Sequence, residues 1–546
     1  MCGIYGGHPG LLHRHTGQLL SHRGPDQHGS RTLRDARGAE FVMGMTRLNI
    51  VDRRNMTIPF SSGGADIVFN GEIYNWKEIR ANLESAGIRF ETETDTEVVL
   101  HAFLHWGPAC LDRLNGMFAF AVWNDGELFM ARDRLGKKPA FYCVEGEEIA
   151  FASELKAFSK LEFVEVELCE RLEFYFDEHT PYRNVKSLRP GEYMIYDTST
   201  RQFRLTTWWQ YPQYQGTLTD SGKALNEFLP LFEDACRLRK MADVPVTLFL
   251  SGGIDSCLIQ AFLKLETTYT VQFPEFKETI NEEDLVREYA DHLGFEARVI
   301  HPTREQFFEV FPDLARYIEF PVGSFSIFPL FCLARQARED GFKVALSGEG
   351  ADEFFNGYYR NEMLLEEHQL LSRYLSGPYK HLAARYFGSD LERQCRMASR
   401  NGIDDVELLK NAFEGRWHVD APFAHNMSVI EASVFLQALL IMADRMSMAN
   451  SLEVRNPFMD HRIVEFSTKL APELRYRDGR GKQLLREALK EALGTERLGI
   501  LRRPVKHGLP SPVNTWLFRT NTFERRDWNR IMLGECLRQM NLRHCD

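Results

Sequence analysis

The sequence has no apolar run long enough to cross a membrane: Val434 to Ala443 is about half of the ~20 residues that a membrane helix needs. No basic segment followed by an apolar stretch opens the chain, so we expect a cytoplasmic protein without a membrane partner. No lysine or arginine block stands out, and 66 basic against 77 acidic residues argue against a nucleic-acid partner. The ten cysteines form no C-x-x-C pair, which favours reduced, buried thiols.

The chain has enough hydrophobic residues, 44% of 546, to form several buried cores. At ~150 residues per domain, its length predicts two to four domains. Up to about Leu205, short runs of β-branched and aromatic residues alternate with turn residues. Between them, Trp76 to Ala86 and Thr94 to Trp106 have apolar residues at helical spacing, and Thr94 with Glu97 fits a capping box. This half is predicted to be stacked β-sheets covered by helices.

Residues 208–222 break all periodicity and are rich in turn formers, so we place the domain boundary there. A predicted strand at 244–250 then leads into SGGIDS and a helix, and further strands and helices alternate after it. This alternation predicts a doubly wound parallel α/β sheet, which binds ligands at the carboxyl ends of its strands. From Leu364 onward, leucine-rich helical patterns prevail.

A cysteine at position 2 means little by itself, but it gains a function if Met1 is removed. The same residue then carries a thiol nucleophile and a free α-amino group, whose pKa of ~7.7–8.0 suits a general base near neutral pH.

Six segments strengthen this interpretation because of their order and spacing. They are CGIYG at the terminus, SHRGPDQHG, TRLNIVD, FNGEIYN, TDTE and ARDRLGKKPAFY. Together they resemble the glutaminase domain of class II glutamine amidotransferases. With SGGIDS, SGEGADE and DRMSMANSLEVRNPFMDH, the chain to about residue 520 resembles a glutamine-hydrolysing asparagine synthetase. The resemblance implies an Ntn-type sandwich at 2–207 and an ATP-dependent synthetase domain at 220–530.

By this resemblance, Cys2 attacks the side-chain amide of glutamine and releases ammonia. Asn70 and the backbone N–H of Gly71 would form the oxyanion hole. Arg47 would bind the α-carboxylate, and two carboxylates would hold the α-ammonium: Glu72 and Asp95. Singly, each has a structural explanation, since Asn70-Gly71 is also an ordinary hairpin dipeptide and an acidic residue suits the first turn of any helix.

SGGIDS lies between a predicted strand and a helix, where backbone N–H groups and a helix N-terminus can close around a polyphosphate. It lacks the G-K-[ST] ending of a Walker A motif, so γ-phosphate transfer is the poorer explanation. It resembles the loop of N-type ATP pyrophosphatases, which release AMP and pyrophosphate. A tight strand-to-helix turn is the structural alternative.

The resemblance assigns roles in this domain residue by residue. The pyrophosphate would be bound by Ser251, Gly252, Gly253 and Ser256. Asp255 would hold Mg²⁺, with Asp352 near metal or substrate. Val271 would contact the adenine region, and the nucleotide would also lie near Ser347 and Gly348. Glu349 would face the acyl-adenylate and the incoming ammonia, and Lys482 would neutralise pyrophosphate charge, although a solvated helix face also explains a lysine there.

Two segments depart from the family pattern, and both are expected to border the acceptor pocket. They are VGSFSIFP after Pro321, and RRPVKHGLP with His507 and Leu509. Aspartate, amidated to asparagine, is the leading substrate. It needs cations for its spared carboxylate, for which Arg455 and Lys506 are candidates, and an acid for its ammonium, for which Glu349 and Asp352 are candidates. Each of these four residues could equally be part of a surface or structural ion pair.

Two other interpretations stay open. The first is the same mechanism acting on another biosynthetic carboxylate. The second is a catalytically silent regulatory protein, which intact Cys2, Asn70, Asp255 and Lys482 disfavour. A homodimer is an option that the sequence leaves open, and an ammonia channel between the two sites is implied by the resemblance alone.

Overall fold

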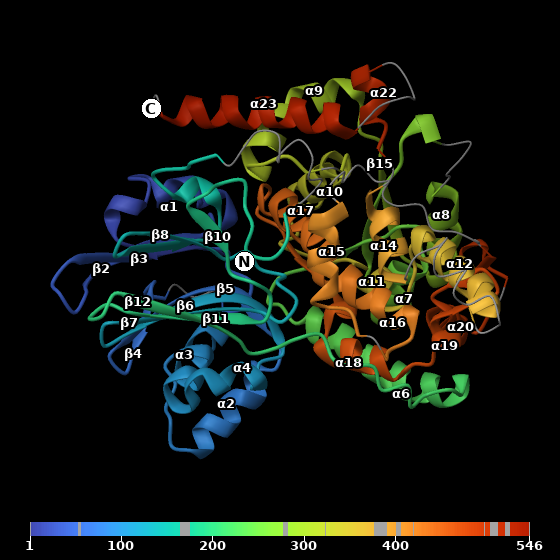
Figure 1. The fold of residues 1–546 in the computed structure, drawn as a ribbon, viewed down its shortest axis with the longest axis horizontal. Coiled ribbons are helices and arrows are strands. Elements are labelled where there is room, and N and C mark those ends of the chain that lie inside the picture. The colour runs from blue at the N-terminus through green and yellow to red at the C-terminus, as the bar shows by residue number, and fades with distance from the viewer. Residues whose placement is uncertain are drawn as a thin grey trace.

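The computed structural model of the protein describes a chain in two halves that lie against each other (Figure 1). The residues it describes are 2–52, 56–163, 175–276, 282–322, 324–375, 390–399, 406–418, 420–495, 497–502, 511–518 and 525–544.

The N-terminal half is a sandwich of two antiparallel sheets. The first has the order β10-β8-β9-β1-β3-β2, from Val185–Ser187, Phe141–Glu145, Glu148–Ala152, Cys2–Gly7, Glu40–Arg47 and Gln27–Arg34. The second has the order β12-β11-β7-β6-β5-β4, from Gln202–Thr207, Glu192–Asp197, Glu127–Arg132, Gly116–Asn124, Ala65–Ile73 and Phe60–Ser62. Side chains such as Ile4, Met43 and Val68 fill the space between them.

Helices α2 (Trp76–Ser85) and α3 (Asp95–Trp106) cover the outer face of the second sheet, which confirms the predicted sandwich with helical cover. The N-cap of α3 is Thr94, whose hydroxyl accepts a hydrogen bond from the backbone of Glu97 at 3.3 Å. Only this half of the predicted capping box forms. The carboxylate of Glu97 instead accepts from the backbone N–H groups of Glu91 and Thr92, at 2.8 and 2.6 Å.

The C-terminal half contains the predicted parallel sheet, with the order β15-β14-β13-β16-β17. Its strands are Glu296–Ile300, Thr267–Val271, Val246–Phe249, Val344–Leu346 and Glu453–Arg455. Neighbouring residues of β13 and β16 belong to apolar clusters on opposite faces, so both faces are covered. The strand order reverses between β13 and β16, which is where such sheets bind ligands.

The sequence did not predict strand β17, nor the two-stranded sheet of β18 (Tyr476–Arg477) and β19 (Arg480–Gly481). The region was expected to be helical, and a three-residue strand with two charged side chains does not show the apolar run of a buried strand.

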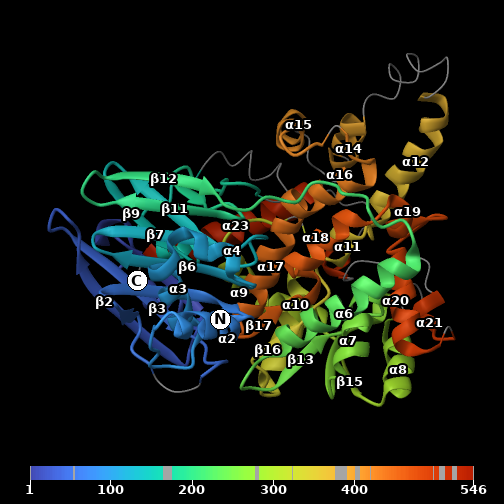
Figure 2. The ribbon, with the colours of Figure 1, turned by 90° about the horizontal axis from the view of Figure 1, so that it is seen from below.

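Helices surround this sheet (Figure 2). Before β16 they are α6 (Ser221–Lys240), α7 (Ile254–Leu263), α8 (Glu282–Leu293), α9 (Arg304–Ile318) and α10 (Ile327–Glu339). Between β16 and β17 they are α11 (Ala351–Phe354), α12 (Tyr359–Leu375), α14 (Asp390–Ser399), α15 (Val406–Glu414), α16 (Phe423–Ile430) and α17 (Leu436–Met448). After β17 they are α18 (His461–Lys469), α19 (Pro472–Arg475), α20 (Gln483–Leu493), α21 (Gly499–Arg502), α22 (Val513–Phe518) and α23 (Arg525–His544).

In the part of the chain that the structure describes, one helical stretch, Phe423–Met448, is long and apolar enough to cross a membrane, but 72% of its apolar window is buried inside the protein. Burial on most sides explains its apolar character without a bilayer. The eight cysteines among the described residues are all buried and form no disulfide with one another, as predicted. The cytoplasmic location stays a prediction.

Candidate active sites

Strand pairing brings Cys2 together with two of its predicted partners. Cys2 begins β1 and lies opposite Arg47 at the end of β3. Its backbone N–H donates to Oδ1 of Asn70, on β5 of the facing sheet, at 3.1 Å. Burial raises the pKa of the Cys2 thiol. The buried thiol therefore needs a base to be deprotonated near neutral pH.

Asn70 is fully buried, and its amide nitrogen has no hydrogen-bond partner among the described residues. Buried donors are rarely left without a partner, so an orphaned one beside a thiol indicates a ligand position. The glycine at position 71 has a separate structural explanation, because a Cβ there would lie 2.2 Å from the carbonyl oxygen of Met117 on β6. The close approach of the two strands thus requires glycine at this position, independently of any role of its backbone N–H.

Arg47 and the two predicted acids line the same place, which we call the N-terminal site together with Cys2 and Asn70. The guanidinium of Arg47 donates to the carbonyl oxygens of Val51 and Asp52, at 3.2 and 2.8 Å. Asp95 accepts from the backbone N–H of Ile73 at 3.0 Å.

Glu72 faces away from water on β5. One of its carboxylate oxygens accepts from Arg455 at 2.8 Å, and the other has no partner among the described residues. Burial raises the pKa of Asp95 to about 6 and that of Glu72 well above its ordinary value. Two buried acids of this kind form a site that a cation would complete.

SGGIDS forms the turn from β13 into α7, and its serines hold the turn together. The hydroxyl of Ser256 accepts from the backbone N–H of Ser251 at 3.0 Å, and Ser251 accepts from the backbone N–H of Gly253 at 3.3 Å. Gly253 is the N-cap of α7. Gly252 lies in the same turn. The geometry is a strand-to-helix loop at a helix N-terminus, which suits an anion.

A cavity of about 280 Å³ opens at the carboxyl ends of β13, β14 and β16, and we call it the C-terminal cavity. Its lining includes eight residues with predicted roles: Ser251, Asp255, Ser256, Val271, Ser347, Gly348, Glu349 and Asp352. The predicted nucleotide and metal residues of the C-terminal half thus converge on one space of ligand size.

Lys482 lies beneath this cavity as the N-cap of α20. Its ammonium group is 2.7 Å from a carboxylate oxygen of Asp255 and 2.6 Å from one of Asp352. Gly357, which sequence analysis did not single out, makes room for it: a Cβ there would lie 1.9 Å from Cε of Lys482.

Glu353 is a second residue that sequence analysis missed. It lines the C-terminal cavity, and burial raises its pKa to about 7. Tyr358 donates to its carboxylate at 2.5 Å. The three acidic residues of the SGEGADE motif were the sequence signal from which Glu353 could have been predicted as a site residue.

The remaining wall of the C-terminal cavity is largely aliphatic and aromatic: Leu330, Leu333, Tyr358, Tyr359, Leu439 and Met442. Ser326, from the divergent VGSFSIFP segment, also lines it, so this segment does border the pocket. Among the described residues the lining contains no arginine, lysine or histidine. Lys506, His507 and Leu509 lie outside the described residues.

Arg455 does not line the cavity. It is fully buried on β17 and pairs with Glu72 and Glu453, at 2.8 and 2.5 Å, which is the structural ion pair that the sequence left open as the alternative to acceptor binding. The sequence did not separate these two roles, because the strand that turns Arg455 toward the N-terminal half was not predicted.

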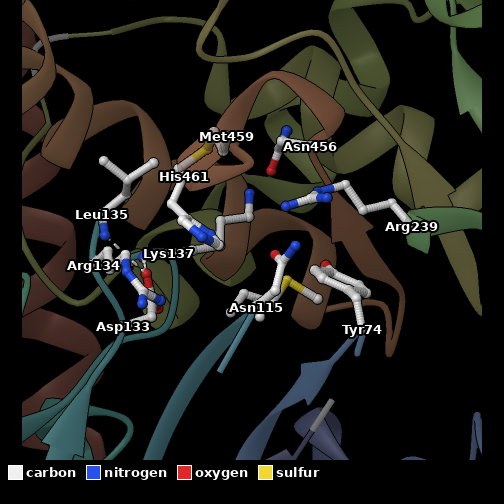
Figure 3. A pocket seen from close by; sticks show the side chains of 12 residues that line it. Tyr74, Asn115, Asp133, Arg134, Leu135, Lys137, Arg239, Asn456, Met459 and His461 are labelled. Carbon is white, nitrogen blue, oxygen red and sulfur yellow. Dashed lines mark hydrogen bonds between the residues drawn. The ribbon is translucent and has the colours of Figure 1, made fainter. Parts of the chain in front are cut away.

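A small cavity of about 20 Å³ lies between the halves (Figure 3), and we call it the interface cavity. Tyr74 and Asn115 line one side of it, and Asn456 and His461 line the other. Burial lowers the pKa of His461 to about 4. Asn456 also donates to the carboxylate of Glu349, so it lies between this interface cavity and the C-terminal cavity.

Comparisons with known proteins agree with this two-part arrangement. Residues 1–209 match the family model of the glutamine amidotransferase domain, and residues 227–540 match that of asparagine synthase. The chain is 31% identical to Bacillus subtilis asparagine synthetase [glutamine-hydrolyzing] 1, over 95% of this chain and 86% of that protein. It is also 31% identical to B. subtilis asparagine synthetase [glutamine-hydrolyzing] 3, over 87% and 80%.

A search of solved structures finds the glutamine phosphoribosylpyrophosphate amidotransferase of B. subtilis. The TM-score is 0.29 at 15% identity, over 56% of this chain and 70% of that one.

Proposed function

Since the chain belongs to the asparagine synthase family of ATP-dependent, glutamine-hydrolysing ligases, we propose that it activates a carboxylate as an acyl-adenylate and amidates it with ammonia released at Cys2. Residues 2–207 would form the glutaminase domain and residues 220–530 the synthetase domain. Mature protein would begin at Cys2.

The observation that carries the glutaminase half is the orphaned amide nitrogen of Asn70 beside Cys2. In the proposed reaction the Cys2 thiol adds to the glutamine amide carbon and its proton passes to the α-amino group of the same residue. Asn70 and the backbone N–H of Gly71 donate to the oxyanion, and the amino group returns the proton to the leaving ammonia. Water then hydrolyses the thioester to glutamate.

Substrate binding in the N-terminal site follows from charge. Arg47 would take the α-carboxylate of glutamine. Its α-ammonium would be taken by Asp95 and by the carboxylate oxygen of Glu72 that has no hydrogen-bond partner among the described residues.

In the synthetase half, an oxygen of the acceptor carboxylate would attack the α-phosphorus of ATP, and pyrophosphate would leave. Ser251, the following glycines and Ser256 would hold the pyrophosphate. Lys482 would leave its two carboxylate partners to neutralise it. Ammonia then attacks the acyl carbon, and AMP leaves.

Asp255 and Asp352 fit Mg²⁺, because this ion is usually held by one or two carboxylates together with phosphate oxygens and water. No cluster of three or more metal-ligating side chains occurs among the described residues, so phosphate would have to supply further ligands. When bound, Mg²⁺ would neutralise phosphate charge in the transition state.

The interface cavity would form part of the ammonia route, because it lies between the two halves and because Asn456 at its edge contacts Glu349. Because burial holds His461 neutral, this side chain would not protonate ammonia that passes it.

Aspartate is the proposed acceptor, and Glu349 and Asp352 are the candidate partners of its ammonium. A second acceptor class is favoured by the aliphatic and aromatic wall of the C-terminal cavity and by the absence of cationic side chains among its described lining residues. Such a pocket suits a larger or less charged carboxylate.

The experiment that separates these acceptors supplies the enzyme with ATP, Mg²⁺, glutamine and one carboxylic acid at a time, and measures amide product and AMP. Aspartate is expected to give asparagine with stoichiometric AMP. AMP release that stays at background with aspartate and rises with another acid would replace aspartate. ADP and phosphate as products would reject the adenylate.

Cys2→Ala tests the glutaminase assignment. Glutamine hydrolysis is expected to fall roughly 10⁴-fold or more, while amidation with added ammonium salt is retained. Wild-type glutaminase activity in this variant would refute the role of Cys2.

A further inference from the structure

One buried arginine, Arg23, connects Cys2 to helix α17 of the C-terminal half. Nε of Arg23 donates to the backbone carbonyl oxygen of Cys2 at 3.1 Å. The same guanidinium forms a bidentate pair with Asp444 on α17, at 2.8 and 3.2 Å. Arg23 and Asp444 are both almost completely buried.

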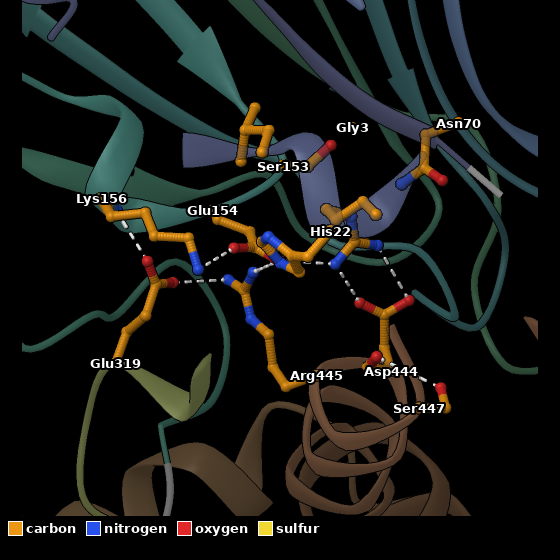
Figure 4. Close-up of polar contacts among 12 residues, drawn as sticks. Gly3, His22, Asn70, Ser153, Glu154, Lys156, Glu319, Asp444, Arg445 and Ser447 are labelled. Carbon is orange, nitrogen blue, oxygen red and sulfur yellow. Dashed lines mark hydrogen bonds and ion pairs between the residues drawn. The ribbon is translucent and has the colours of Figure 1, made fainter. Parts of the chain in front are cut away.

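A network of charges surrounds this contact at the interface of the halves (Figure 4). Glu154 accepts from Arg23 at 2.8 Å and forms an ion pair with Arg445 at 2.7 Å. Arg445 also pairs with Glu319 at 2.9 Å. Since water is excluded, every charge in this network depends on its partners.

A second contact reaches the glutamine-binding side of the same site. Arg455 on β17 donates to Glu72 at 2.8 Å. It is anchored within its own half by Glu453 at 2.5 Å and by the carbonyl oxygen of Arg239 at 3.1 Å. Glu72 therefore takes its position from a strand of the other domain.

Both contacts come from one short stretch of chain that also touches the C-terminal cavity. Leu439 and Met442, earlier on α17, line the cavity, and Asn456, directly after β17, holds Glu349. Residues 439–456 are thus in contact with both sites.

We propose that Asp444 and Arg455 of the synthetase domain are positioning residues of the glutaminase site: Asp444 fixes Cys2 through Arg23, and Arg455 fixes Glu72. This rests on glutamine hydrolysis at Cys2, as proposed above. Neither residue touches glutamine. Asp444 orients the strand end that bears the nucleophile, and Arg455 holds the acid that receives the substrate ammonium.

The two contacts predict different kinetic effects. Asp444→Asn keeps the size of the side chain but removes the charge that pairs with Arg23, so kcat for glutamine hydrolysis should fall roughly tenfold. Arg455→Gln should instead raise KM for glutamine roughly tenfold, because Glu72 loses its orienting partner, and Arg455→Lys should recover part of the loss by retaining a cation.

Gln437→Ala is the matched control. Gln437 lies on the same helix as Asp444 and donates across the interface to the carbonyl oxygen of Leu135 at 3.0 Å, but contacts neither Cys2 nor Glu72. Its glutamine kinetics should equal those of the wild type. In all four variants, synthesis with ammonium salt should stay within about twofold of the wild type, which shows that the fold and the C-terminal cavity are intact.

Each outcome has a distinct meaning. If Asp444→Asn and Arg455→Gln have the same glutamine kinetics as Gln437→Ala, the inference is overturned. It is also overturned if the two variants lose ammonia-dependent and glutamine-dependent synthesis in parallel, because the contacts would then only support the fold. Retained hydrolysis in Cys2→Ala would refute the glutaminase assignment itself.

Discussion

In the N-terminal site the polar groups lie inside a sandwich of strands, whereas in the C-terminal cavity they lie on loops at the ends of parallel strands. Cys2, Arg47 and Asn70 are set by strand register, and burial shifts the pKa of Cys2 and of both nearby acids. Lys482 pairs with two acids that line the cavity, Asp255 and Asp352. The positions of the polar groups in the first site are thus set by strands, whereas the second site holds its cation in ion pairs that a phosphate ligand would rearrange.

Among the substitutions that test this difference between the two sites, Asn70→Ala should have the largest effect on activity. Because the orphaned amide nitrogen is the proposed oxyanion donor, kcat for glutamine hydrolysis should fall roughly 10²–10³-fold. Steady-state glutaminase assays measure this, with ammonia-dependent synthesis as the internal control. An unchanged kcat would refute Asn70 as the oxyanion donor.

Gly357→Ala should break the other site. The added Cβ would displace Lys482 from between Asp255 and Asp352, and a displacement of about 1 Å can cost roughly 10²-fold in rate. AMP formation should fall with either nitrogen source, while glutamine hydrolysis persists. If both activities fall together, the substitution has disturbed the whole fold.

The charge state of Asp95 should affect the pH dependence of kcat/KM for glutamine. Since burial raises its pKa to about 6, kcat/KM for glutamine should fall about tenfold per pH unit below that value as the carboxylate becomes protonated. Stability should change in the opposite sense. The raised pKa in the folded state adds stability below the unfolded pKa of ~3.9, and this contribution is lost as pH rises through about 6.

Asp95→Asn provides the comparison for that titration. Its glutaminase activity should be lower at all pH values, and the inflection near 6 should be absent both from the rate profile and from denaturant unfolding followed at pH 4 to 7. Persistence of the inflection would assign it to Glu72 instead.

Thr94→Ala should have the smallest effect. Loss of the N-cap of α3 should cost about 1 kcal/mol of stability. Because Asp95 is the next residue, KM for glutamine should rise slightly. Thr303→Ala removes the capping box of α9 in the other half and is the matched control, with a similar stability loss and unchanged KM. Equal KM in both variants would show that helix fraying does not reach Asp95.

The positions of the proposed glutaminase residues could be predicted because the motifs that carry them are contiguous. Cys2, Arg47, Asn70 and Glu72 lie on strands of the sandwich, and Asp95 begins α3. The wall of the C-terminal cavity could not be predicted, since Ser326, Tyr358 and Met442 come from distant segments that only the fold brings together. Strand β17 was missed because Glu453 and Arg455 neutralise each other when buried, which local hydrophobicity does not reveal.

The placement of Arg455 has a consequence for exchanging parts between relatives. Residues 208–222 mark the domain boundary in the sequence. The buried charges of β17 and α17 nevertheless have their partners on the N-terminal side of this boundary. A chimera that joins the first 207 residues of one family member to the remainder of another therefore has to match Arg23 with Asp444 and Glu72 with Arg455. The two halves are modules in the order of the sequence, whereas their compatibility is decided by these few paired positions.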